Sequence, residues 1–130
     1  MKIAATISRI LLGLLFTVFG LNGFLHFLKM APPTGQLAGQ YMGALFLSHY
    51  LSVVFLLELI GGVLLLVNRY VPLALVLLGP VIVNIVLFHS TMAPEGLPMA
   101  LVATVLWFVL FASVRKAFAG VFQAKVVEAA

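Results

Sequence analysis

Four long apolar runs, separated by short polar or proline-containing breaks, constrain this chain more than any other feature. They cover about residues 3–28, 51–67, 71–88 and 97–114. A helix needs about 20 predominantly apolar residues to cross the hydrocarbon of a bilayer, and each run is close to that length. In lipid the backbone polar groups must be bonded within the segment itself, so helices are the expected structure. The runs therefore predict four membrane-spanning α-helices.

The charge content supports this interpretation. Only 8% of the 130 residues are charged, whereas a soluble domain carries about 25%. A surface that faces water cannot be built from so few charges. We therefore expect one all-α domain, residues 1–130, folded as an integral membrane four-helix bundle whose main partner is the lipid bilayer.

Residues 36–48, between the first and second runs, are too short and too polar to span. Their apolar residues roughly follow a helical period, and the sequence 48–50 suggests a bend. We predict a short helix lying at the outer membrane interface. The alternative is a simple extension of the second span.

Lysine and arginine predict the orientation, because cytoplasmic loops retain positive charges. Lys29 lies on one side of the predicted membrane; the other side carries Lys2, Arg9, Arg69, Arg115, Lys116 and Lys125. Both termini are therefore expected in the cytoplasm, with the chain in a bacterial or archaeal inner membrane. These cations form no stripe along one face, so nucleic acid is not an expected partner.

A few strongly polar side chains fall inside the predicted spans, where each costs a few kcal/mol and is a default functional candidate. They are Asn22, His26, Glu58, Asn84 and His89. At about 1.5 Å per residue from the nearest basic residue, Asn22, Glu58 and Asn84 share a layer about 16 to 22 Å into the span. The two histidines lie about 25 to 30 Å in, at the outer mouth.

These residues predict a polar pocket among three helices that opens to the outer side. Asn22 and His26 are four residues apart and share a helix face, and Glu58 shares its face with two glycines that permit close helix approach. A carboxyl group at that depth is expected to be protonated and able to donate a hydrogen bond. The alternative is that Glu58 bonds Asn22 or Asn84 and only joins helices.

Further interpretations concern the two histidines and two aromatic residues. His26 and His89 could form a bis-imidazole haem site, but His89 lies about 140° around the helix from Asn84, so haem ligation is not favoured, and no metal site is expected. Phe24 could line the pocket. Trp107, near the middle of the fourth run, needs a partner for its indole N–H, either a packing neighbour or a ligand.

Several segments, taken in order, resemble the DoxX family of small membrane proteins. They are residues 9–16, 20–24, 58–62, 68–75, 80–84 and 88–89. The resemblance covers nearly the whole chain and implies a four-helix membrane bundle. It also implies a link to quinone-dependent oxidoreductases, because the family is named for a subunit associated with a thiosulfate:quinone oxidoreductase. This chain has Asn22 and Gly23 where the family commonly has a lysine after glycine, so Glu58 lacks that cationic partner.

Two hypotheses of function follow. In the first, the chain is a subunit of a membrane redox system that binds a quinone-like or lipid headgroup with Glu58, Asn22 and Asn84, and receives electrons from a partner. The chain has no cysteine, so thiolate chemistry is excluded, and whether it is an enzyme stays open. In the second, it is a non-enzymatic scaffold or assembly factor that docks a membrane or periplasmic partner, or another copy of itself.

Overall fold

The computed structural model describes residues 2–129, which are all-helical and contain no strand. The elements are α1 (Lys2–Leu25), α2 (Gln36–Leu47), α3 (Tyr50–Leu66), α4 (Val71–Thr91), the 3₁₀ turn η1 (Pro94–Gly96), α5 (Leu97–Val114) and the 3₁₀ segment η2 (Arg115–Phe122). The four apolar runs correspond to α1, α3, α4 and α5, with ends that differ from the expected ones by at most three residues. Helix α1 ends at Leu25 rather than Leu28 because His26 takes a left-handed conformation, φ 52°.

Three of these helices are long and apolar enough to cross a membrane, and there are four spans if the bent pair of α2 and α3 counts as one. The long helices are α1, α4 and the α5 segment with its flanking 3₁₀ turns. Large apolar side chains remain exposed along their outward faces, for example Val83, Leu87, Val105 and Phe108. Such a surface suits lipid and not water. The chain is thus a multi-pass membrane protein.

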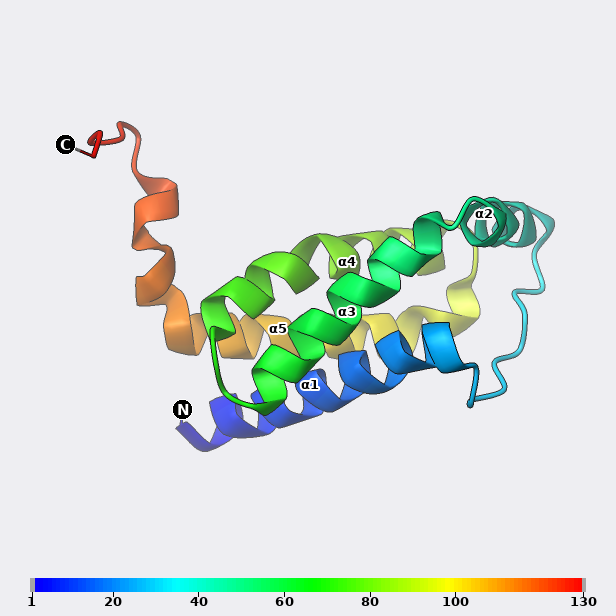
Figure 1. Cartoon of the computed structure of the whole chain (residues 1–130), viewed down its shortest axis with the longest axis horizontal. Coiled ribbons are helices and arrows are strands. Elements are labelled where there is room, and N and C mark those ends of the chain that lie inside the picture. The colour runs from blue at the N-terminus through cyan, green and yellow to red at the C-terminus, as the bar shows by residue number, and fades with distance from the viewer. Residues whose placement is uncertain (1, 130) are drawn as a thin grey trace.

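Helix α2 lies across one end of the molecule and does not continue α3 (Figure 1). The two helices are bent by 83° at the break between them, where His49 has a left-handed backbone with φ 61°. The alternative of a simple extension of the second span is therefore wrong. The ring of Tyr41 in α2 stacks on Phe88 near the end of α4, with centroids 5.6 Å apart, which holds α2 against that end.

Helices α1, α3, α4 and α5 lie side by side (Figure 1), with α1 and α4 each packed against both α3 and α5. The core between them includes the fully buried side chains of Leu12, Phe16, Leu65, Leu75 and Leu78. The α1–α3 contact is the most intimate, because glycines let the backbones meet. A Cβ on Gly20 would lie 2.8 Å from the backbone nitrogen of Leu59, so the space beside Gly20 is already filled.

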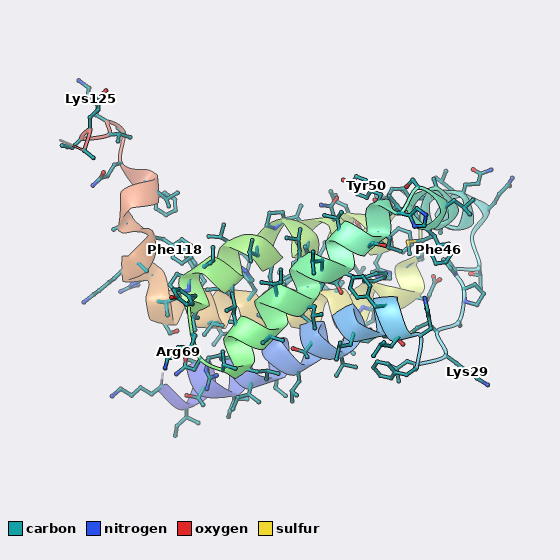
Figure 2. All side chains as sticks on the ribbon, in the orientation of Figure 1. Lys29, Phe46, Tyr50, Arg69, Phe118 and Lys125 are labelled. Atoms are coloured by element: carbon teal, nitrogen blue, oxygen red, sulfur yellow. The ribbon has the colours of Figure 1, made fainter. Side chains whose placement is uncertain are left out.

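The two ends of the packed helices differ in charge. Arg69, in the connection between α3 and α4, lies at the end where α1 starts and η2 begins, whereas Lys29 lies at the opposite end, the end at which α2 also lies (Figure 2). Lys2, Arg9, Arg115 and Lys116 all line one cavity. We call this the basic end; α2 covers the other, which we call the α2 end.

Candidate functional site

Glu58 is the one acidic residue in the described part of the chain that the fold buries, with 6% of its surface exposed. Its helix turns the buried residues Glu58, Gly61, Gly62 and Leu65 inward. Gly61 abuts Leu78 of α4 and Gly62 abuts Thr17 of α1. Since Glu58 is one helical turn away from both glycines, its carboxyl group lies inside the molecule, on the side where α1 and α4 approach α3.

The Glu58 carboxyl group makes no hydrogen bond and no ion pair with any group in residues 2–129. Of the two amides expected to bond it, Asn84 donates instead to the carbonyl of Pro80, 2.9 Å away, and Asn22 does not bond the carboxyl group. Trp107 donates to the carbonyl of Leu75, 3.0 Å away. Arg9 does not pair with Glu58 either, because its guanidinium group donates to the carbonyl of Leu65 at the basic end. The interior therefore contains a carboxyl group without a protein partner.

A fully buried polar atom without a partner lies in the helix packed against α3. The hydroxyl oxygen of Thr17 is buried and has no hydrogen-bond partner among residues 2–129. Thr17 abuts Gly62, one helical turn from Glu58. Sequence reasoning missed Thr17, because threonine in a helix usually bonds the carbonyl four residues earlier and is then unremarkable. The candidate site is accordingly the pair Glu58 and Thr17 at the α1–α3 contact.

Asn22 is buried, 8% exposed, as expected for an interior residue. Its side-chain oxygen accepts a hydrogen bond of 2.7 Å from the backbone N–H of Leu28. That bond holds the residues that follow α1 against the end of the helix, so the side-chain oxygen of Asn22 has a structural role. The amide NH₂ group makes no hydrogen bond within the described residues and is free to donate.

Asn84 does not line an interior site. Its side chain is exposed on the outward face of α4, and its NH₂ group donates to the carbonyl of Pro80 in the same helix. The interior placement predicted for Asn84 is therefore wrong. Depth along a helix did not decide the face, and a bond to the carbonyl four residues earlier satisfies the NH₂ group without any other helix.

The two histidines are not brought into the site either. His26 is exposed just beyond the end of α1, where its backbone N–H bonds the carbonyl of Asn22. The Nδ1 atom of His89 lies 2.9 Å from the carbonyl oxygen of Ala93, and its ring packs against Gly96. His89 thus fastens η1 to α4. Across residues 2–129 no group of three or more His, Cys, Asp or Glu side chains is placed to hold a metal ion.

The aromatic candidates have packing partners. The indole of Trp107 stacks on Phe111, with centroids 5.2 Å apart and planes 8° apart, and its N–H bonds Leu75 of α4. Of the two interpretations for Trp107, the structure supports packing. Phe24 is 45% exposed and meets the edge of Phe55, 6.4 Å away, at the α2 end of the α1–α3 contact, so it lies toward the α2 end from Glu58.

Comparison with known proteins finds no matching family model, curated protein or solved structure. The class of protein therefore rests on the fold alone: a multi-pass helical membrane protein with one buried, unpartnered carboxyl group.

Proposed function

We propose that this chain is a subunit of a membrane redox system in a bacterial or archaeal inner membrane, and that Glu58 hydrogen-bonds the polar head of a quinone-like or lipid molecule. In this proposal the chain is a four-helix bundle of the DoxX type with both termini in the cytoplasm. The observation that supports it best is the Glu58 carboxyl group, buried without a partner among the described residues.

The energetic argument concerns what such a group costs. Leaving a buried hydrogen-bonding group unsatisfied costs about 1–3 kcal/mol, and polar groups in membrane spans normally pair with one another or mark a ligand path. Thr17, which abuts Gly62 one helical turn from Glu58, adds a buried hydroxyl oxygen without a partner. A quinone-like head, which offers carbonyl or hydroxyl oxygens, would give the Glu58 carboxyl group a hydrogen-bond partner.

The proposed site opens toward the α2 end. Phe24 lies between Glu58 and that end of the molecule, and its ring packs against Phe55. In the proposal this aromatic pair and the free NH₂ group of Asn22 guide the ligand head from the α2 side. Asn84 and His26 take no part, because both are exposed to the surroundings of the helices. Electrons come from a partner protein.

The test compares Glu58→Leu with wild type. We expect Glu58→Leu to lose quinone binding by at least about tenfold, and yet to unfold less easily, by about 1–3 kcal/mol, because the unsatisfied carboxyl group is gone. The purified full chain would be titrated with ubiquinone and menaquinone analogues in detergent, and unfolded with SDS. Asn84→Leu is the matched control, since it removes a polar side chain of similar size from the outward face, and it should bind as wild type does.

Two results would refute the proposal. One is quinone binding that Glu58→Leu leaves unchanged. The other is loss of binding together with a less stable fold, which would mean that Glu58 supports packing rather than a ligand. Glu58→Gln, which keeps donor and acceptor but cannot release a proton, separates binding from proton transfer: binding that is retained while quinone reduction by the complex falls supports an acid–base role.

A second candidate, a scaffold or assembly factor, is favoured by Asn84. An amide on an outward face of a spanning helix is unusual in lipid, and such groups often bond a neighbouring helix. This function predicts that Asn84→Leu, and not Glu58→Leu, weakens association with a second copy or a partner. Cross-linking in native membranes followed by mass spectrometry would show it, and an unchanged cross-link pattern in Asn84→Leu would exclude this role for Asn84.

A further inference from the structure

A groove at the basic end concentrates positive charge that the proposed function does not use. It lies between the start of α1, the connection from α3 to α4, and the junction of α5 with η2, and its volume is about 710 Å³. The charged residues that line it are Lys2, Arg9, Arg115 and Lys116. We call it the basic groove. No acidic residue lines it, so nothing within the groove neutralises these four cations.

The floor of the groove is fixed by Arg9. Its guanidinium group donates to the carbonyls of Leu65 and Leu66, at the C-terminal end of α3. A cation near a helix C-terminus is stabilised by the partial negative charge there. Arg9 is therefore held in place before any ligand arrives, and a preorganised cation loses less entropy on binding.

The rim of the groove carries three more cations, Lys2, Arg115 and Lys116. Lys2 comes from the first turn of α1, while Arg115 and Lys116 begin η2, where the chain turns away from α5 (Figure 1). All three are exposed. Hydrogen-bonding groups lie between the cations: Thr6, Asn68 and Ser113 line the same groove. This set of donors matches the oxygens of a phosphate diester, which accept several charge-assisted bonds at once.

Apolar surface continues from the groove. Leu110, Ala112 and Val114 line its inner wall, and Ile3 and Ile7 are 76% and 51% exposed on the same first turns of α1. At its far end, segment η2 also presents exposed Val121 and Phe122. A ligand seated here would have its anionic head among the cations and its chains along the helices, which is the shape of a phospholipid.

The geometry points to a binding site for an anionic phospholipid, of the phosphatidylglycerol or cardiolipin class, in the basic groove. Basic pockets between spanning helices at the positively charged membrane side take such headgroups. The inference is independent of Glu58, because the groove lies at the basic end while Phe24 and the ligand path proposed above lie toward the α2 end. The site would anchor the chain in an anionic leaflet and hold η2 against it.

Native mass spectrometry of the purified full chain in non-ionic detergent tests the site. Phosphatidylglycerol and phosphatidylcholine of matched chain length are added in equal amounts, and the bound lipid is counted. We expect phosphatidylglycerol to be retained preferentially. Replacing both rim cations of η2, Arg115→Gln with Lys116→Gln, should weaken it about 25-fold, at about fivefold for each cation. Arg9 is left intact because it bonds α3.

The matched control is Lys29→Gln with Lys125→Gln, which removes the same charge from positions outside the groove. This control should bind phosphatidylglycerol as wild type does. Equal retention of the two lipids would overturn the proposal, as would equal losses in the two double variants. A third sample contains free glycerol phosphate at millimolar concentration. If the lipid stays bound, the site is one for phospholipid. If glycerol phosphate displaces the lipid, the groove is a site for soluble phosphates and the assignment is overturned.

Discussion

Gly20 gives the sharpest prediction at the level of single residues. A Cβ there would lie 2.8 Å from the backbone nitrogen of Leu59 and 3.0 Å from the carbonyl of Phe55, and backbone atoms cannot move aside cheaply. Gly20→Ala should therefore separate α1 from α3 and lower the free energy of unfolding by about 1–3 kcal/mol. Titration with SDS, followed by circular dichroism, measures this.

Gly39→Ala is the control for that prediction. Gly39 lies in α2, and a Cβ there would meet nothing within 4 Å. The same substitution should be neutral or stabilising, by up to about 1 kcal/mol, because alanine favours the helix. Equal effects of the two alanines would show that α1 and α3 do not meet as the structure has them.

The sequence predicted some residues well and others poorly, for a common physical reason. Glu58 could be placed inside because Gly61 and Gly62 on the same face mark a close helix contact. Asn84 had no such glycine neighbour to mark the face that meets another helix. In an apolar helix the periodicity that normally distinguishes the core-facing side from the exposed side is also missing, since lipid and protein core accept the same side chains. Thr17 could not be singled out, because only the packing shows that its hydroxyl oxygen lacks a partner.

Among the elements, the contact between α4 and α5 depends on Trp107. Its indole N–H bonds the carbonyl of Leu75 across the two helices, at 3.0 Å. Trp107→Phe keeps an aromatic ring against Phe111 but removes this bond, so the free energy of unfolding should fall by about 0.6–2 kcal/mol. The SDS titration again measures the change.

Phe108→Leu serves as the comparison for Trp107→Phe. Phe108 is the next residue in α5, is 60% exposed and packs edge-on against Trp107, with centroids 5.2 Å apart. Its replacement removes this aromatic contact but keeps the bond from Trp107 to Leu75. We expect little change. A loss as large as that of Trp107→Phe would mean that aromatic area, and not the bond to Leu75, stabilises α5.

The order and the ends of the long helices could largely be predicted from the sequence, because the runs of apolar residues end at prolines, glycines and polar residues. The bend near His49 was expected from the sequence, but its angle of 83° was not. That angle depends on the left-handed backbone of His49 and on the stacking of Tyr41 against Phe88. The stacking joins distant segments, so no local sequence pattern contains it. Segment η2 was not predicted. From the sequence its cations, Arg115 and Lys116, indicated only the orientation, whereas in the fold they line the basic groove.

For the molecule as a whole, the decisive property is how many times it crosses the bilayer. Three helices span by length and composition, and a fourth crossing requires that α2 and α3 together count as one. An even number returns the chain to its starting side, in agreement with the collection of Lys2, Arg9, Arg115 and Lys116 around one groove. An odd number would place the two termini on opposite sides.

Labelling of single cysteines tests this claim most directly, and the natural chain, which has no cysteine, needs no prior change. Cysteine would be introduced at Thr34, Asn68, Glu95 or Gln123, and spheroplasts treated with a membrane-impermeant maleimide. We predict that Thr34 and Glu95 are labelled in intact spheroplasts, and that Asn68 and Gln123 are labelled only after the membrane is disrupted. Labelling of Gln123 from outside while Asn68 stays protected, or of all four positions alike, would contradict four crossings with both termini inside.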